Sequence, residues 1–224
     1  EIETEPVLQM VDHFMQAIGG SLNPHSDPTL RSYLVNTNLF RSLLALVLQH
    51  PTTHEAEITT RLLVLIVQSG HQLQAIKVSN LAPPPDSPLL HILYDDITAM
   101  IKFIRSPIST GNFQAVGHVY NVKAIFLQLI SELLQDTALD PLNIELIDLA
   151  SDLGRLLRKC DHILMCQSTG DFFVSLFSPV GLHYRALATK FTPLYVLLVD
   201  CLHHKYPLMS IGTVFRIMRC MVHI

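Results

Sequence analysis

Cysteine and histidine are the residues of this chain most able to bind a metal, and it has four Cys and twelve His. Three motifs have a spacing that could suit zinc: Cys160-x-His162-x-x-x-Cys166, Cys201-x-x-His204 and Cys220-x-x-His223. The last two motifs each place two ligand types on one helical face, so an antiparallel helix pair could bring them together as a tetrahedral site. Cysteine in an apolar helical stripe is, however, ordinarily a small core residue. We therefore predict no metal ligands, no cofactor and folding without a metal.

Motifs of known catalytic machinery are missing from the sequence. The string His54-Glu55-x-x-Ile58 lacks the second His of a zinc protease, and there is no nucleophile elbow, P-loop or dinucleotide-binding glycine motif. The adjacent carboxylates of Asp95 and Asp96 would diverge by about 100° on a helix. Asp148 and Asp152 would share a helical face, but next to arginines. Both pairs are typical of a charged outer face, so we predict no catalytic residues and a non-enzymatic protein.

Apolar residues are spaced as in helices along most of the chain, so helices would have to position any functional side chains. Ser, Thr, Asn or Asp repeatedly precedes Pro or a helix former and then apolar residues three and four apart, which is typical of helices joined by turns. Strand-like alternation is nearly absent, so we expect strand content near zero. The pattern predicts helices over 5–18, 28–35, 38–49, 54–69, 71–77, 88–105, 113–135, 141–158, 160–167, 171–177, 182–204 and 208–223.

One domain over 1–224 is expected, because the longest predicted loops, 79–87 with its three prolines and 106–112, are too short for domain linkers. Truncating its central core residues to Ala should cost about 2–5 kcal/mol. The predicted core residues are Leu43, Leu44, Val47, Leu62, Leu63, Ile66, Leu90, Leu93, Ile97, Ile101, Ile125, Leu129, Leu133, Leu146, Leu149, Leu153, Leu194, Leu198 and Leu202.

The segment 38–105 carries a repeat-like order of apolar strings. They are Leu39-Phe40-x-x-Leu43-Leu44-x-x-Val47-Leu48, Ile58-x-x-x-Leu62-Leu63-x-Leu65-Ile66-x-x-Ser69-Gly70 and Leu89-Leu90-x-Ile92-Leu93. This segment resembles armadillo and HEAT-type repeats. The resemblance implies an all-α fold, a right-handed α-solenoid of about ten to twelve helices, with a compact all-α bundle as the alternative built by the same packing rules. The chain has no Trp, so the peptide-clamping mode of importin-like armadillo proteins is not implied.

The composition favours an intracellular protein, cytoplasmic or nuclear. The cysteines are few and lie in the last third, so we expect reduced thiols, and we find no glycosylation acceptor and no leader. The longest purely apolar run, 62–67, is far shorter than a membrane span. The chain begins without Met and ends within an apolar pattern, so we expect a segment of a longer protein.

Charge is distributed unevenly and suggests where a partner binds. Residues 1–152 carry 7 Lys and Arg against 16 Asp and Glu, a net charge of −9, whereas residues 153–224 carry 8 against 3, a net charge of +5. Such an asymmetry can orient partners. The last predicted helix also offers an apolar face flanked by Arg216 and Arg219. We therefore predict partner contacts at Arg155, Arg158, Lys159, Phe215, Arg216, Met218, Arg219 and Val222.

The leading hypothesis is a non-enzymatic scaffold that binds another protein through an acidic amphipathic helix or peptide. Two alternatives stay open at this point. A compact all-α domain could bind a small hydrophobic ligand, for which the Leu, Phe and Met content is suitable. An accessory nucleic-acid-binding subunit could use the basic C-terminal third, although the overall pI of about 6.3 makes nucleic acid the less favoured partner.

Overall fold

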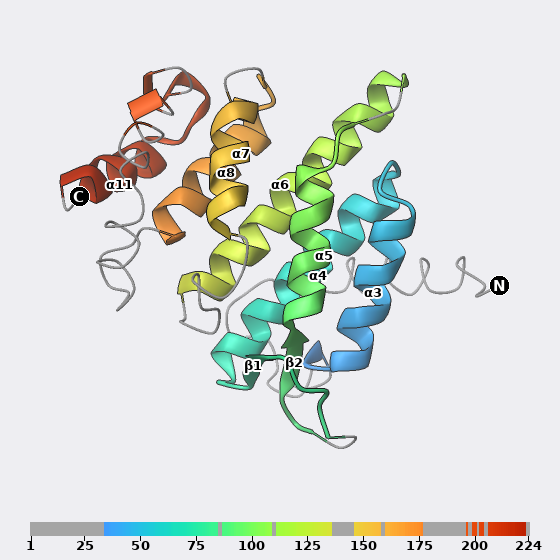
Figure 1. Cartoon of the computed structure of the whole chain (residues 1–224). Coiled ribbons are helices and arrows are strands. Elements are labelled where there is room, and N and C mark those ends of the chain that lie inside the picture. The colour runs from blue at the N-terminus through green and yellow to red at the C-terminus, as the bar shows by residue number, and fades with distance from the viewer. Residues whose placement is uncertain are drawn as a thin grey trace, which may run out of the picture.

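The computed structural model describes residues 34–84, 87–108, 111–135, 146–157, 160–176, 196, 199–200, 202–203 and 206–222. Figure 1 shows these elements along the chain. The elements are α3 (Thr37–Gln49), α4 (His54–Gln72), β1 (Ile76–Ser79), β2 (Leu90–Leu93), α5 (Tyr94–Arg105), α6 (Phe113–Gln135), α7 (Leu146–Leu157), α8 (Ile163–Leu176), the 3-10 helix η1 (Tyr206–Leu208) and α11 (Ile211–Val222). The all-α class is confirmed. The described residues contain seven α-helices, whereas about ten to twelve were predicted for the whole chain.

The helices pack in two rows. Helices α4, α6, α8 and α11 contact one another in that order, and α3, α5 and α7 form the second row against them. Each helix of the second row also contacts the next helix along the chain, so α3 packs on α4, α5 on α6 and α7 on α8. Helix α11 therefore lies at the opposite end of the array from α3 (Figure 1).

The apolar core runs between the two rows. Its largest fully buried side chains include Phe40, Phe126, Phe172 and Phe173. Phe103 meets the edge of Phe126 at a ring-centroid distance of 5.7 Å, joining α5 to α6. Most of the predicted core residues are buried, which confirms the apolar helical periodicity as a guide to the core. Leu93 and Leu202 are only half-buried, which corrects their assignment, and Leu194 and Leu198 lie outside the described residues.

Polar side chains cap the first turns of α3 and α4. The Asn36 side-chain oxygen accepts bonds from the backbone N–H groups of Asn38 and Leu39 at the start of α3. The Thr53 hydroxyl accepts one from Ala56 at the start of α4. These bonds satisfy N–H groups that have no partner within the helix. They fix where α3 and α4 begin, close to the predicted starts.

A short parallel strand pair corrects the prediction of near-zero strand content and of a helix over 71–77. Strands β1 and β2 pair from Ile76 with Leu90 to Ser79 with Leu93. Helix α4 runs to Gln72, past the predicted end at 69, and Gln74 with a φ of 52° then turns the chain. Four residues rich in β-branched side chains are too few to distinguish a strand from a helix by periodicity. Because residues 90–93 form β2, α5 begins at Tyr94 rather than at 88.

Helix α8 is continuous, whereas we predicted two helices over 160–167 and 171–177. Gly170 lies inside this helix, at its contact with α11. A Cβ at this position would lie 2.8 Å from Cγ2 of Thr213. The glycine therefore permits close packing rather than ending the helix.

The last helix begins later than the predicted 208. A 3-10 turn over Tyr206–Leu208 precedes it, and the Ser210 hydroxyl accepts a bond from the Thr213 N–H, so α11 begins at Ile211. The predicted helices over 5–18 and 28–35, and most of 182–204, lie outside the described residues. In the part of the chain that the structure covers, no helix has both the length and the apolar character to cross a bilayer.

Candidate functional site

Helix α11 is held on α8 by a small, well-packed contact. Ile217 and Thr213 are fully buried and face α8, and the close approach at Gly170 lets Thr213 pack against that helix. The Thr213 hydroxyl lies 2.8 Å from a carboxylate oxygen of Asp171. This combination of apolar packing and one partly buried hydrogen bond fixes which side of α11 faces the array.

The opposite side of α11 is apolar and exposed. Ile211, Phe215 and Met218 are 77%, 67% and 50% exposed. Their spacing of four and three residues places them on one face at 100° per residue, away from Ile217. Large apolar side chains gathered on one exposed face are typical of an interaction surface. We call Ile211, Phe215 and Met218 the α11 outer face.

Two arginines lie on one flank of the α11 outer face. Arg216 pairs with Asp171 at 2.6 Å between Nη2 and Oδ1, so its charge is partly balanced within the chain. Arg219, one turn beyond Phe215, is exposed. Helix α11 itself carries no acidic residue. The flank is therefore cationic. Helix α11 holds five of the eight predicted partner-binding residues, and the structure describes the side chains of four of them: Phe215, Arg216, Met218 and Arg219.

Arg155, another predicted partner-binding residue, does not join this surface in the structure. Arg155 lies on α7, where it is 3.7 Å from Asp152, and Asp152 also binds Arg105 of α5 at 2.7 Å. Arg155 thus belongs to the charged contact between α5 and α7. Arg158 and Lys159 lie outside the described residues, and the side chain of Val222 does too. Sequence reasoning missed Ile211, although the predicted helix over 208–223 included it.

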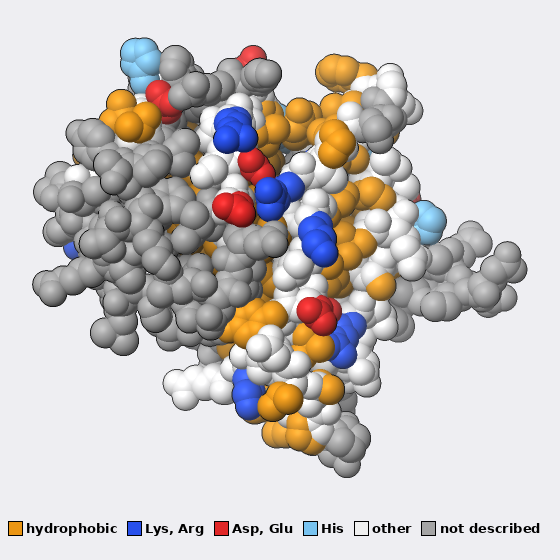
Figure 2. Space-filling view, viewed as in Figure 1, with side chains coloured by type: hydrophobic (Ala, Val, Ile, Leu, Met, Phe, Trp, Pro, Cys, Tyr) orange, Lys and Arg blue, Asp and Glu red, His pale blue; other side chains and the backbone are white. Residues whose placement is uncertain are grey.

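The Lys and Arg side chains on the face shown in Figure 2 are scattered over it, and most of them have an Asp or Glu nearby. The carboxylate of Asp96 accepts bonds from Arg41 and from the Leu93 N–H. The interpretation of Asp95 and Asp96 as a charged surface pair is correct for Asp95, which is exposed. Asp96 instead joins α3 to the start of α5.

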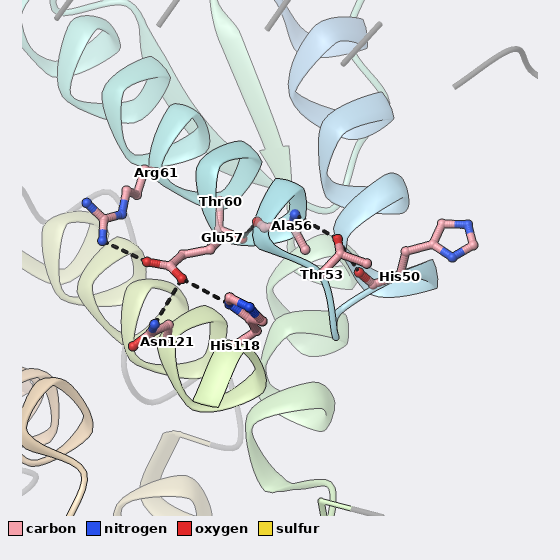
Figure 3. A network of polar contacts seen from close by, with 8 residues as sticks. All are labelled: His50, Thr53, Ala56, Glu57, Thr60, Arg61, His118 and Asn121. Atoms are coloured by element: carbon pink, nitrogen blue, oxygen red, sulfur yellow. Dashed lines mark hydrogen bonds and ion pairs between the residues drawn. The ribbon is translucent and has the colours of Figure 1, made fainter. Parts of the chain in front are cut away.

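A polar network joins α4 to α6 and was missed by sequence reasoning. Glu57 of α4 is buried, and Figure 3 shows its carboxylate directed at α6. Its Oε1 accepts from Arg61 at 2.8 Å, and its Oε2 accepts from Asn121 at 2.9 Å and lies 3.4 Å from Nδ1 of His118. The Glu57–Arg61 spacing of four residues was readable in the sequence, but the partners on α6 are 61 and 64 residues away.

Burial and hydrogen bonding act oppositely on Glu57. Burial alone would raise the pKa of Glu57, but the bonds from Asn121, His118 and Arg61 outweigh it and lower the pKa below its usual value. The carboxylate is therefore ionised at neutral pH. His54 lies beside this network, with its ring centroid 5.8 Å from that of His118. Two imidazoles and a carboxylate thus gather at one end of the α4–α6 contact.

A buried lysine lies at a second site, between α5, α6 and α7. Lys123 is 3% exposed, and its ammonium donates to the carbonyl oxygen of Ser106, the residue that ends α5. The ammonium also lies 5.6 Å from the centre of the Phe103 ring. Burial lowers the pKa of Lys123 to about 8. The side chain lines a cavity of about 280 Å³ together with Tyr120, the ion pair of Arg105 and Asp152, and mostly apolar residues.

Ser87 and His91 form a close pair near the strands. The Ser87 hydroxyl lies 2.9 Å from Nε2 of the buried His91. Burial, and then the charge of Lys77, lower the pKa of His91, which keeps it neutral. Its Nδ1 has no hydrogen-bond partner among the described residues, so no carboxylate in that part of the chain orients the ring as a catalytic triad requires. The pair therefore lacks the third member that would favour nucleophilic catalysis.

The cysteine motifs can be followed only in part. Cys160 and Cys166 are buried and form no disulfide, and the Cys166 thiol donates to the Cys160 carbonyl at 3.4 Å. His162 stacks on Tyr120 at a centroid distance of 5.3 Å. This motif therefore serves packing around the start of α8. Neither Cys-x-x-His motif near the C-terminus can be followed as a ligand pair, because its side chains lie outside the described residues.

Comparison of the chain with known protein families, with curated proteins and with solved structures found no match.

Proposed function

We propose that the chain is a non-enzymatic protein-interaction module, a segment of an armadillo or HEAT-type α-solenoid that binds an acidic amphipathic helix of another protein on the α11 outer face. The observation that carries this proposal is the combined exposure of Ile211, Phe215 and Met218 on one face of a helix whose other face is packed. The two-row packing of the described helices supports the solenoid part of the proposal.

A partner helix would extend the row in the way that α11 extends it from α8. Within the row α4, α6, α8 and α11, each helix is covered on the side facing the next one. The α11 outer face presents large apolar side chains for the same kind of helix-to-helix packing. Covering these three side chains would contribute about 1–2 kcal/mol each before the costs of association. These three side chains supply about 3–6 kcal/mol in all, less than the roughly 8 kcal/mol that micromolar binding needs, so a partner helix must bury further area beside them.

The charge of the flank selects an acidic partner. Arg216 already has Asp171 as its partner, so Arg219 is the arginine of α11 best placed to meet a carboxylate on a docked helix. Complementary charges at a rim act mainly on the association rate and are weakened by salt. Methionine adapts to partners of different shape, which suits Met218 to such a surface.

Binding of defined peptides tests this proposal. The probes are a synthetic amphipathic helix with Leu at heptad positions a and d and Glu at the flanking positions, and the same peptide with Lys in place of Glu. We expect the acidic peptide to bind at least about tenfold more tightly in fluorescence anisotropy. Arg219→Glu should reduce this preference and its salt dependence. Arg155→Glu, which makes the same change of net charge on α7, should leave both unchanged.

Equal binding of the two peptides, or an equal effect of Arg219→Glu and Arg155→Glu, would contradict the proposal. The first result would show that the cationic flank selects nothing. The second would show that net charge, not the α11 flank, attracts the peptide.

The cavity beside Lys123 favours a second candidate function, binding of a small apolar carboxylate. A buried ammonium whose pKa shift has burial as its only cause, and which lines a cavity of about 280 Å³, suits one carboxylate with an apolar body. A thermal-shift screen with short-chain fatty acids and aromatic acids tests it. Stabilisation that is lost in Lys123→Met supports this candidate, and no stabilisation by any acid in the screen contradicts it.

A further inference from the structure

His54, Glu57 and His118 gather three potential metal ligands at one place. One ligand atom of each lies within 4.8 Å of the others, and no other such group occurs among the described residues. His54 is the first residue of α4, and Glu57 lies one turn further along the same helix. His118 comes from α6, so the packing of α4 on α6 assembles the group. None of the three was predicted as a ligand from the sequence.

The ligand types and spacing suit zinc. Two imidazoles and one carboxylate, with a fourth position left for water, form a known class of zinc site. Tetrahedral coordination with bonds of about 2.0–2.1 Å places ligand atoms about 3.4 Å apart. Glu57 Oε2 and His118 Nδ1 already lie 3.4 Å apart. His54 is exposed at the start of its helix, so its side chain can rotate to close the remaining separation.

The carboxylate is held in place by groups that would not bind the metal. Arg61 donates to Oε1 of Glu57 and Asn121 donates to Oε2. Hydrogen bonds of this kind orient metal-binding side chains and are a regular feature of metal sites. The Arg61 cation also offsets part of the carboxylate charge, so the affinity should be micromolar rather than that of a thiolate site.

We propose that His54, Glu57 and His118 form a binding site for Zn²⁺ at the end of the α4–α6 contact, with one coordination position open to water. The site is independent of the α11 outer face. It is also not needed for folding, because Arg61 and Asn121 satisfy the buried carboxylate without a metal.

Zinc titration of the full chain, after treatment with a chelator, tests the site. We expect binding by isothermal titration calorimetry, weakened at least about tenfold in His54→Ala, since loss of a group that merely orients a ligand already has such an effect. His118→Ala should weaken binding to a similar extent. The matched control is His50→Ala, because His50 is exposed, lies close to the site in sequence and points away from Glu57 (Figure 3). The zinc affinity of His50→Ala should equal that of the unchanged chain.

Cobalt substitution separates this site from the cysteine motifs. Co²⁺ bound by nitrogen and oxygen ligands should give visible bands without the thiolate charge-transfer band, and Cys201→Ser/Cys220→Ser should leave the bands unchanged. The proposal is overturned if no zinc binds, if His54→Ala binds as well as His50→Ala, or if binding is lost in the cysteine variant. Because His54 is exposed, its variant is expected to fold, which a far-ultraviolet circular dichroism spectrum checks.

Discussion

The α4–α6 contact and the α11 outer face differ in how their side chains are paired and buried. At the first, both carboxylate oxygens of Glu57 have partners inside the chain. At the second, Phe215 and Met218 are at least half exposed, and no described residue covers their outer side. The first region therefore uses polar groups to fix how two helices pair, whereas the second leaves apolar area that only association can bury.

Removing the carboxylate of Glu57 should have the largest effect on stability. Glu57→Ala leaves Arg61, Asn121 and His118 without their acceptor, and we expect a loss of about 2–3 kcal/mol in the free energy of unfolding. Glu55→Ala is the matched control, because Glu55 is exposed on the same turn of α4 and should change stability by about 0.5 kcal/mol or less. Urea denaturation measures both. Equal effects of the two variants would show that the network does not stabilise the α4–α6 contact.

The contribution of Glu57 should also depend on pH. Its pKa is lower in the folded chain than the ordinary 4.5, so below pH 4.5 the unfolded chain binds more protons and stability falls as the pH falls. The contribution is fully present above that pH. We therefore expect the stability difference between the unchanged chain and Glu57→Ala to shrink when urea denaturation is repeated at decreasing pH. A difference that stays constant across this range would rule out an ionised, hydrogen-bonded Glu57.

Substitutions on the packed side of α11 should lower the free energy of unfolding, whereas substitutions on its outer side should not. Gly170→Val places side-chain atoms where even a Cβ would approach Thr213 to 2.8 Å, so we expect a loss of about 1–3 kcal/mol. Amide hydrogen exchange in α11 should become faster. Gly212→Ala is the control, because its Cβ would meet only the Ser210 hydroxyl at 3.9 Å. Unchanged exchange in Gly170→Val would mean that the α8 contact does not hold α11.

Lys123 should give a smaller, pH-dependent effect. Its folded-state pKa of about 8 is below the ordinary 10.5, so between these pH values the unfolded chain binds more protons and stability rises with pH. We expect a gain of about 1–2 kcal/mol across this range relative to Lys123→Met, after allowance for solvent screening. Denaturation at about pH 7.5 and at about pH 10.5 measures it. A parallel pH dependence in the variant would show that Lys123 is not the group responsible.

The apolar helical periodicity predicted much of the fold. Leu63, Ile66 and Leu129, for example, lie three and four residues from other apolar side chains and are fully buried. The strands escaped prediction because four residues such as Ile76–Ser79 fit either period, and their pairing with Leu90–Leu93 depends on contacts across a loop. The predicted break between 167 and 171 was wrong, because Gly170 packs inside α8 against Thr213, which lies far along the chain.

The candidate sites differ in how far local sequence could predict them. The spacing of Phe215 and Met218 lies within one helix, so an apolar face flanked by arginine was visible in the sequence. The group formed by His54, Glu57 and His118 could not be predicted from the sequence. Its members come from two helices, and local sequence does not show that these helices pack together. Arg155 was grouped with α11 on charge alone, and its partner Asp152 places it elsewhere.

Paired measurement of stability and binding for Phe215→Glu and Phe113→Glu tests the central claim most directly. Both side chains are exposed, 67% and 91%, but Phe113 begins α6 and lies off the α11 outer face. We predict that both variants unfold within about 0.5 kcal/mol of the unchanged chain. Only Phe215→Glu should lose binding of the acidic amphipathic peptide, by at least about tenfold. Equal binding by the two variants, or unfolding of Phe215→Glu alone, would contradict the account of α11 as a docking surface.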